Sequence, residues 1–473
     1  MRTSIIPAVS RLEYLSGKLE GKTEPQKVKD DSLSKEEYTI TIKDNNIIVK
    51  ASTDAGFFYA EKTLEQIFFQ YGDTVPNMQI SDKPKYQYRS FMIDSCRHFF
   101  PVEDIKRMIE ICSSLKYNKF HWHLTDDQGW RIQIDKYPEL TSIGSIRKET
   151  NLGKEVTTEP YGGFYTKDEI REVVEFARER FIEVVPEFDV PGHTSALLAS
   201  VPDLCCNGKT VEVKTTQGIF KDILCAGNEK TYKVVFYIID EMCELFPSKF
   251  FHIGGDEAPK EQWKNCEVCQ DKMKQEGLEN EEELQGYFVN RVSDYLKTKG
   301  KRAISWNESL NGGNLNADGM IQYWLDKQEL SKKCENSVIV SDFYAYYVDY
   351  PYHMTPLRKT YNYDEKISDK VIGVDTPIWT EFIKNIDEME NMCFPRYFAV
   401  AQSAWSENKP EYDMFEKDLI RLSGMYDTKN WADKSKWNPN PVLRLGGTLY
   451  HLGIRANLGY KMKSVKDKLK HSN

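Results

Sequence analysis

The sequence predicts an α/β protein: a (β/α)8 TIM barrel preceded by a small α+β domain. Short apolar runs alternate with amphipathic helical stretches, which is typical of buried parallel strands joined by helices. Eight such runs over roughly 320 residues favour closure into a barrel over an open sheet. The runs are 90–94, 118–124, 182–187, 249–254, 302–306, 319–324, 337–341 and 371–379, with helices expected at 102–116, 167–181, 229–246 and 281–299.

Most runs end in a polar or aromatic side chain, which supports the barrel independently. A barrel gathers the C-terminal ends of its strands at one mouth, so residues far apart in sequence would meet there. These residues are Asp94, His123, Glu187, Asp189, Asp256, Glu257, Trp306, Trp324, Trp379 and Glu381.

The first 85 residues indicate a separate α+β unit. Alternating apolar residues at 38–42, a turn at 44–46 and a return at 47–49 predict a hairpin. Apolar residues at helical spacing predict a helix over 54–71, followed by a short strand at 78–80. The polar segment 81–85, which contains Pro84, marks the boundary. We therefore expect a non-catalytic domain at 1–85 and a barrel with a C-terminal extension at 86–473.

Composition narrows the class of protein. Lys and Arg number 64 against 73 Asp and Glu, a net charge of −9 over 473 residues, which argues against a nucleic-acid partner. Nothing approaches the run of about 20 apolar residues that crosses a membrane, and the N-terminus is too polar for a secretory signal. This favours a cytoplasmic protein, with a secreted mature form as the alternative. The sequence does not indicate an oligomeric state.

The sharpest motif is His252-Ile253-Gly254-Gly255-Asp256-Glu257. Two glycines allow a tight turn after a strand, and neighbouring side chains then point in different directions. Asp256 and Glu257 are thus suited to different roles at one substrate. Their like charges raise one pKa, which suits an acid that holds a proton near neutral pH. Ordinary helix capping is the alternative interpretation.

Four histidines leave a metal site open. His121 and His123 share a strand face, and His193 and His252 complete a ligand set for a metal-dependent hydrolase. The alternative is that these rings bond carboxylates in a packed mouth. His193, in the segment from Pro186 to Thr194, could instead tune a carboxylate.

Aromatic and cationic residues suggest a sugar site. Trp306, Trp324 and Trp379 each close a predicted strand, and indole faces stack on the C–H faces of sugars. Core packing is the alternative for any one of them. Arg89, beside the first strand, is the candidate cation for a polar ligand, with a structural ion pair to Glu381 or Asp349 as its alternative.

The pattern of cysteines does not by itself indicate a function. Cys266 and Cys269 form a CxxC pair on an expected polar loop. Zinc would need two more ligands, and Cys205, Cys206 and Cys225 are too scattered in sequence to be predicted as those. A disulfide or a metal clip remains the alternative.

The long motifs resemble those of family 20 glycoside hydrolases, the β-N-acetylhexosaminidases. They are Tyr88 to Asp94 with Arg97-His98-Phe99, His121 to Arg131, Pro186 to Thr194 and His252 to Glu257, in correct order within residues 88 to about 405. Residues 1–85 resemble the non-catalytic N-terminal domain of that family. Asn307 stands where the family often has Asp.

The resemblance implies a retaining exo-glycosidase without cofactor or metal. It would remove terminal β-linked GlcNAc or GalNAc from glycans or glycoconjugates, and the sugar's own acetamido oxygen would be the nucleophile, forming an oxazolinium ion. The resemblance leaves open the choice between the two sugars, the natural aglycone and the release of a mono- or a disaccharide.

Roles follow residue by residue from the same resemblance. Glu257 would be the general acid and base, and Asp256 would hold the acetamido N–H. Tyr347, chosen within the cluster Tyr344, Tyr346, Tyr347 and Tyr350, would bond the acetamido oxygen. The remaining assignments are acetamido walls at Trp306, Trp324 and Trp379, hydroxyl contacts at Arg89, Asp349 and Glu381, and proton relay at Asp126 and His193. A catalytically inactive sugar-binding barrel is the third alternative.

Overall fold

The computed structural model describes residues 2–447 apart from 22, 154 and 328–333. Eight parallel strands close into a barrel in the order β14-β15-β16-β17-β18-β19-β6-β7, so the predicted (β/α)8 barrel is confirmed. Each predicted run matches one strand to within two residues at either end. The strands are β6 (Tyr88–Asp94), β7 (Lys119–His123), β14 (Glu183–Glu187), β15 (Phe250–His252), β16 (Arg302–Trp306), β17 (Met320–Tyr323), β18 (Ser337–Val340) and β19 (Val371–Ile378).

Helices surround the barrel, and most of them bury one apolar face, whereas α13 is buried on all sides. In α4, the capping box of Thr166 and Glu169 begins the helix, and Ile170, Val173 and Ala177 are buried at helical spacing. The outer helices are α2 (Val102–Ser114), α4 (Lys167–Arg178), α6 (Glu229–Leu245), α9 (Glu281–Thr298), α11 (Leu357–Asn362), α12 (Ile386–Cys393), α13 (Arg396–Trp405), α14 (Tyr412–Leu422) and α15 (Lys434–Trp437). The first four match the predicted helices.

Short elements lie in the loops that follow the barrel strands. They include the helices α3 (Glu139–Ser142), α5 (Ser195–Ser200), α7 (Glu261–Lys264) and α8 (Glu267–Glu276), and the 3-10 helices η1 (Pro202–Leu204) and η2 (Asn307–Leu310). A third 3-10 helix, η3 (Ser423–Met425), directly follows α14. The short strands are β8 (Thr125–Asp126), β9 (Gly129–Trp130), β10 (Ile146–Arg147), β11 (Thr150–Leu152), β12 (Glu155–Thr157) and β13 (Tyr161–Gly162).

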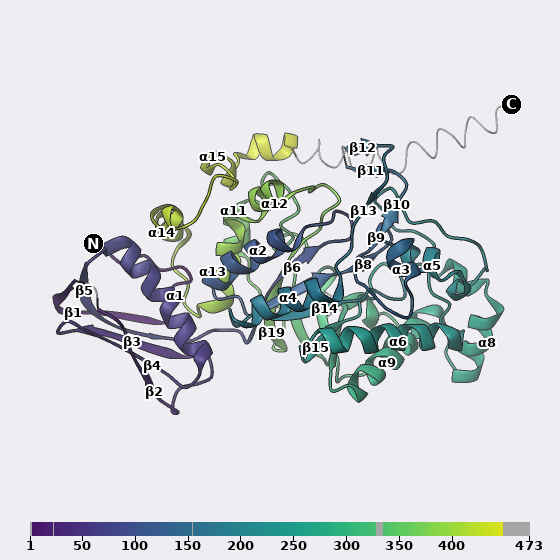
Figure 1. Cartoon of the computed structure of the whole chain (residues 1–473), viewed down its shortest axis with the longest axis horizontal. Coiled ribbons are helices and arrows are strands. Elements are labelled where there is room, and N and C mark those ends of the chain that lie inside the picture. The colour runs from purple at the N-terminus through teal and green to yellow at the C-terminus, as the bar shows by residue number, and fades with distance from the viewer. Residues whose placement is uncertain (1, 22, 154, 328–333, 448–473) are drawn as a thin grey trace.

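The N-terminal unit lies beside the barrel, at the purple end of the chain (Figure 1). Its five-stranded sheet has the order β1-β5-β3-β4-β2. The strands are β1 (Arg11–Glu20), β2 (Gln26–Lys29), β3 (Tyr38–Lys43), β4 (Asn46–Ala51) and β5 (Thr74–Asp82). Helix α1 (Asp54–Tyr71), capped by the Thr53 side chain, occupies the predicted range.

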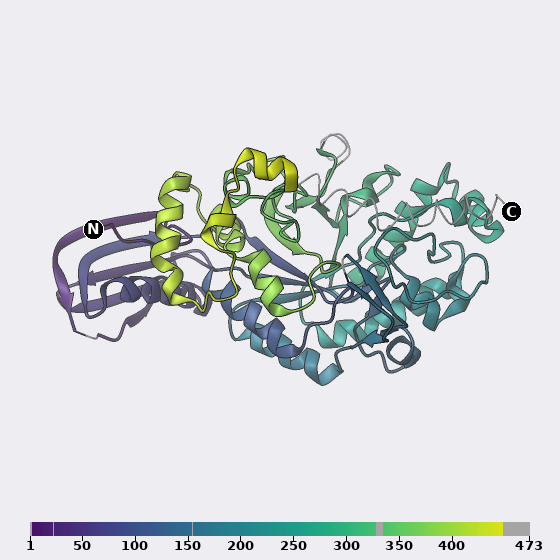
Figure 2. The ribbon, with the colours of Figure 1, turned by 90° about the horizontal axis from the view of Figure 1, so that it is seen from above.

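A buried polar cluster joins the two units. Asp82, at the end of β5, accepts hydrogen bonds from Tyr38 Oη (2.5 Å), Trp405 Nε1 (2.9 Å) and Lys116 Nζ (3.1 Å). The side chains of Lys116 and Asp82 are both fully buried. The polar segment at 81–85 is therefore anchored at one end in an interface. Figure 2 shows the two units from above, with α14 next to the N-terminal unit.

Among the described residues, none of the helices combines the length and apolar character needed to cross a bilayer.

Candidate active site at the barrel mouth

The C-terminal ends of the barrel strands carry the candidate site. Asp94, His123, Glu187, His252 and Trp306 are the last residues of β6, β7, β14, β15 and β16. Because the strands are parallel, these side chains meet at one end of the barrel, as the sequence predicts.

The turn after β15 requires its two glycines. Gly254 and Gly255 have φ values of +64° and +95°, a region that favours glycine. A Cβ on Gly254 would lie 1.7 Å from Asp189 Oδ1. That carboxylate also accepts a hydrogen bond from the N–H of Gly255 at 3.1 Å. Asp189 therefore fixes the turn that directly precedes Asp256 and Glu257.

Asp256 and Glu257 occupy different environments. The side chain of Asp256 is 13% exposed, whereas that of Glu257 is 34% exposed. Burial raises the pKa of Asp256 to about 6, with the ring of His193 opposing the shift and the carboxylate of Glu257 adding to it. Two adjacent acids with separate surroundings can perform separate tasks.

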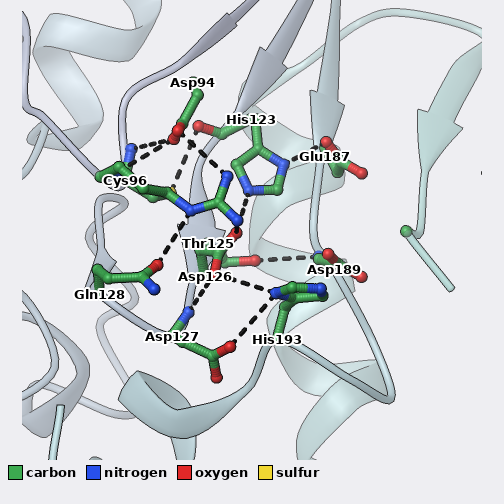
Figure 3. Close-up of polar contacts among 12 residues, drawn as sticks. Asp94, Cys96, His123, Thr125, Asp126, Asp127, Gln128, Glu187, Asp189 and His193 are labelled. Atoms are coloured by element: carbon green, nitrogen blue, oxygen red, sulfur yellow. Dashed lines mark hydrogen bonds and ion pairs between the residues drawn. The ribbon is translucent and has the colours of Figure 1, made fainter. Parts of the chain in front are cut away.

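Asp126 lies at the centre of a charged network (Figure 3). Its carboxylate is 2.9 Å from His123 Nε2, 3.3 Å from His193 Nδ1 and 2.8 Å from Arg97 Nη2. Burial lowers the pKa of His193, but Asp126 and Asp127 outweigh it and hold that pKa well above its usual value. The other ring nitrogen, Nε2, lies 3.5 Å from Glu257 Oε2. A positively charged ring therefore faces the acid pair.

The other three histidines surround Glu187. His121 Nε2 is 3.0 Å and His252 Nδ1 2.8 Å from its carboxylate, and His123 Nδ1 also contacts it. Although burial opposes ionisation, these rings hold the pKa of Glu187 well below its usual value.

The four histidines thus contact two carboxylate centres, with His193 at Asp126, His121 and His252 at Glu187, and His123 bridging the two. His121 Nδ1 also lies 2.8 Å from Asp375, so both nitrogens of His121 and both of His123 face carboxylates at bonding distance. Groups such as His121, Glu187 and His252 bring their potential ligand atoms within 4.8 Å of one another. The short ring-to-carboxylate distances nevertheless favour hydrogen bonding over the four-histidine metal site considered from the sequence.

Aromatic side chains gather beside the acids. Trp379 lies between Trp306 and Tyr347, with ring centroids 6.0 and 6.4 Å apart, and Tyr347 stacks on Trp324 at 6.0 Å. Trp306 Nε1 donates to Glu187 Oε1 at 3.0 Å, which fixes that indole. The structure thus brings the three predicted tryptophans together with Tyr347.

The tyrosine cluster divides into distinct positions. Tyr344 is exposed, and Tyr346 packs into a separate apolar cluster. Tyr347 is buried, and burial together with the carboxylates of Asp256, Asp349 and Glu308 holds its pKa well above its usual value. Within this cluster, Tyr347 is thus the buried tyrosine whose ring contacts Trp324 and Trp379.

Glu308 is an acid that the sequence analysis did not select. It accepts hydrogen bonds from Trp324 Nε1 at 2.9 Å to each oxygen. Burial raises its pKa to about 8, with Asp256 adding to the shift. Its position two residues after the strand-ending Trp306 was the available signal.

The position of Arg89 does not fit the role predicted for it. The predicted sugar-binding arginine lies in the domain interface, where its guanidinium bonds Glu36 Oε2 at 2.9 Å and the carbonyls of Tyr86 and Lys116 at 2.8 Å. The reason is strand direction: Arg89 is at the start of β6, the end of the barrel opposite the mouth. The predicted alternative partners, Glu381 and Asp349, are not its ion-pair partners either.

Arg97 occupies the place that Arg89 was expected to fill. It follows the C-terminal end of β6, pairs with Asp94 at 3.2 Å and lies 4.9 Å from the ring centroid of Trp379. Burial opposes its charge, but nearby acids, including Asp126, Asp94 and Glu381, raise its pKa. Glu381 therefore lies within electrostatic reach of Arg97, and a mouth-facing arginine is present.

Family models match both units of the chain. The model described as glycosyl hydrolase family 20, catalytic domain, matches residues 86–408, and the one described as glycosyl hydrolase family 20, domain 2, matches residues 8–83. The chain belongs to glycosyl hydrolase family 20.

Individual family 20 proteins resemble the chain over most of its length. A β-hexosaminidase of Porphyromonas gingivalis is 36% identical over 404 residues, covering 79% of this chain and 51% of that protein. The chain thus spans about half the length of this relative.

Two solved structures are also similar. A β-N-acetylhexosaminidase has 28% identity and a TM-score of 0.85, covering 93% of this chain and 99% of that one. The exo β-N-acetylglucosaminidase of Vibrio harveyi, solved with N-acetylglucosamine, has 27% identity and a TM-score of 0.79, covering 91% and 78%.

Proposed function

We propose that this family 20 protein is a retaining exo-β-N-acetylhexosaminidase that uses the acetamido group of its substrate as nucleophile. One observation carries the proposal: Asp256, the sequence neighbour of Glu257, lies within electrostatic reach of Tyr347, whose ring contacts the aromatic group of Trp306, Trp324 and Trp379. Family 20 is an exception to the usual two-carboxylate scheme because its substrates supply the nucleophile.

The first step would form an oxazolinium ion. The acetamido oxygen attacks the anomeric carbon, the glycosidic C–O bond breaks, and Glu257 gives its proton to the leaving oxygen. Asp256 accepts the acetamido N–H and stabilises the positive charge that develops there. The low exposure of Asp256 strengthens this interaction, while the greater exposure of Glu257 suits a group that meets an aglycone and then water.

The second step would reverse the proton's path. Glu257, now a carboxylate, takes a proton from water as the water oxygen bonds to the anomeric carbon and the oxazolinium ring opens. The configuration at that carbon is retained because it is inverted twice. No bond to an enzyme carboxylate forms, so a second nucleophilic acid is not required.

The aromatic side chains would hold the acetamido group over the anomeric carbon. Trp306, Trp324 and Trp379 supply apolar faces, and the Tyr347 hydroxyl donates to the acetamido oxygen. Fixing the nucleophile in this way contributes through proximity. The mutual contacts of the rings support the proposal, because each indole is already positioned by a neighbour.

Arg97, Asp349 and Glu381 would bind the sugar hydroxyls. Arg97 takes the role first expected for Arg89, since it lies at the mouth and Asp94 orients its guanidinium. Charged partners for neutral hydroxyls give strong, directional hydrogen bonds. His193 and Asp126 are positioning residues: Asp126 holds the ring, and the ring faces Glu257.

The proposed substrates are glycans or glycoconjugates that end in β-linked GlcNAc or GalNAc. Support comes from the Vibrio harveyi relative, whose solved complex contains N-acetylglucosamine.

Kinetics on aryl glycosides test the proposal. The full chain should release p-nitrophenol from its β-GlcNAc glycoside, and fluorination of the N-acetyl group should slow the reaction progressively because the carbonyl becomes a poorer nucleophile. The matched β-glucoside, which has no acetamido group, should be a very poor substrate. Equal rates on the glucoside and the β-GlcNAc glycoside would overturn substrate assistance. The β-GalNAc glycoside, run in parallel, gives the sugar preference.

A further inference from the structure

We propose that Cys206, Cys225, Cys266 and Cys269 bind one structural zinc ion, which ties together the two loops that carry the catalytic acids and their histidine. These four cysteines lie outside the proposed sugar site, and their binding of zinc does not depend on the proposed function.

The four sulfur atoms have the spacing of a tetrahedral thiolate site. Cys225 Sγ is 3.6 Å from Cys269 Sγ and 3.8 Å from Cys266 Sγ, and Cys206 Sγ is 3.8 Å from Cys269 Sγ. All four lie within 4.8 Å of one another. A zinc–sulfur bond of about 2.3 Å gives a tetrahedron with edges of about 3.8 Å. Three of the six sulfur–sulfur spacings match that edge, and the other three are within 4.8 Å.

Other fates of these cysteines fit less well. A disulfide needs sulfurs about 2.05 Å apart, and all four residues are free thiols. A four-iron cluster places its cysteines around a cube of iron and sulfide, which needs more room than this cluster has. A single thiophilic ion is the remaining occupant, and four thiolates favour zinc.

The local structure supplies the ligands from two loops. Cys206 and Cys225 belong to the loop after β14, and Cys266 and Cys269 form a CxxC pair at the start of α8. Cys266 is the N-cap residue, and its side chain makes no capping hydrogen bond. The positive end of a helix stabilises a thiolate. Binding would release the thiol protons: Zn²⁺ and four thiols give a zinc tetrathiolate and four protons.

Contacts to the backbone beside the cluster already bring the loops together. Trp263 Nε1 donates to the carbonyl of Leu224 at 2.8 Å. A Cβ on Gly227 would lie 2.2 Å from the carbonyl oxygen of Val268, so only glycine fits this approach. Three of the four cysteines are buried. The structure is therefore built to hold four thiols at one buried point.

The position gives the ion a consequence for the active site. The loop after β14 contains His193, and the segment leading to Cys266 begins at Asp256 and Glu257. Zinc–sulfur bonds would hold the two segments together. We therefore expect removal of the ion to lower the melting temperature and to make the distance between His193 and Glu257 more variable.

Metal analysis of the full chain tests the site directly. The protein, purified under reducing conditions without chelator, should contain about one zinc per chain after desalting. A mercurial reagent should release that zinc as it titrates the thiols. Less than a tenth of an equivalent of zinc, from growth medium supplemented with it, would overturn the proposal, and so would one equivalent of iron.

Variants and cobalt provide matched controls. Cys206→Ser and Cys269→Ser should lose the metal, whereas Cys205→Ser and Cys243→Ser should retain it. Cys205 is the sequence neighbour of Cys206 but contacts Asn207 and Gln262. If the first two variants do not fold, cobalt substitution of the wild-type chain decides: thiolate-to-cobalt charge-transfer bands support four sulfur ligands, and a weak octahedral spectrum contradicts them.

Discussion

His193 Nε2 lies 3.5 Å from Glu257 Oε2, on the far side of the ring from Asp126. Asp126 and Asp127 keep the imidazole positively charged, so its N–H can stabilise the carboxylate that Glu257 becomes after giving up its proton. The ring thereby connects a buried carboxylate network to the proposed proton donor.

A double-mutant cycle measures this connection. Glu257→Gln should lower kcat by roughly 10²- to 10⁴-fold, the usual contribution of a general acid or base. His193→Gln should lower kcat by about 10-fold or more in the wild-type background, yet only slightly when Glu257 is already Gln. Independent, multiplicative losses would show that His193 does not act through Glu257. Melting temperatures of all variants serve as the folding control.

Titration of Asp256 should produce the acidic limb of the pH profile of kcat/KM. Burial raises its pKa to about 6, and only the ionised carboxylate can stabilise a positive oxazolinium. We expect kcat/KM to fall as the pH drops below about 6, because the group becomes neutral there. In Asp256→Asn the remaining activity should lack this limb. An unchanged limb in that variant would assign the titration to another group.

Arg97 and Arg89 form a matched pair for substrate binding. Arg97→Lys should raise KM by about 10- to 100-fold, since a hydrogen bond from a charged donor contributes about 1.5–3 kcal/mol. Arg89→Lys should leave KM unchanged and lower the melting temperature, because Arg89 holds Glu36 in the domain interface. The opposite pattern would restore the original assignment of Arg89.

Glu308 predicts a pH-dependent stability. Its folded pKa of about 8 exceeds the ordinary value of 4.5 for a glutamate, so the native state retains a proton that the unfolded state releases between those pH values. The stabilisation is complete below the lower value and is lost as the pH rises through the upper one, by up to about 1.4 kcal/mol per pH unit.

Glu308→Gln should remove this dependence. The melting temperature of the variant relative to wild type should increase from pH 5 to pH 8 and level off above that. Glu279→Gln, at an exposed position, should show no such trend. A constant difference across the range would show that Glu308 does not carry the buried proton.

Asp82 predicts the strength of the domain interface. Asp82→Asn leaves the fully buried Lys116 without its counter-ion and should destabilise the protein by about 3–5 kcal/mol in denaturant titrations. Adding Lys116→Met should recover much of the loss, because the unpaired charge is then absent. Failure of the second substitution to recover stability would mean that the ion pair is not the cause.

Buried elements could be predicted from the sequence because their patterns are strong. The barrel strands form apolar runs, and α1 has a clear capping residue and helical spacing. Strands β1 and β2 were not predicted, since they are largely exposed and alternate weakly. Strand direction was available from the sequence and would have separated Arg97 from Arg89, because only Arg97 follows the end of its strand.

Long-range convergence could not be predicted in the same way. Cys206 and Cys225 lie in an irregular loop, and their approach to Cys266 depends on loop packing that no periodic pattern encodes. Asp256 and Glu257 were accessible because a short motif contains both. Their different exposures, however, follow from the three-dimensional turn at Gly254 and Gly255.

Asp82 and Glu36, which pair with barrel cations across the interface, bear on how this chain can be shortened or recombined. A barrel cut free at residue 86 would lose both carboxylates, and it would expose to water the two cations, Lys116 and Arg89, that the intact interface buries. A shortened chain would therefore carry two additional surface charges where the full chain has two largely buried ion pairs. The boundary lies near residue 85 in the sequence, but two ion pairs cross it, so the charges of the two units depend on each other.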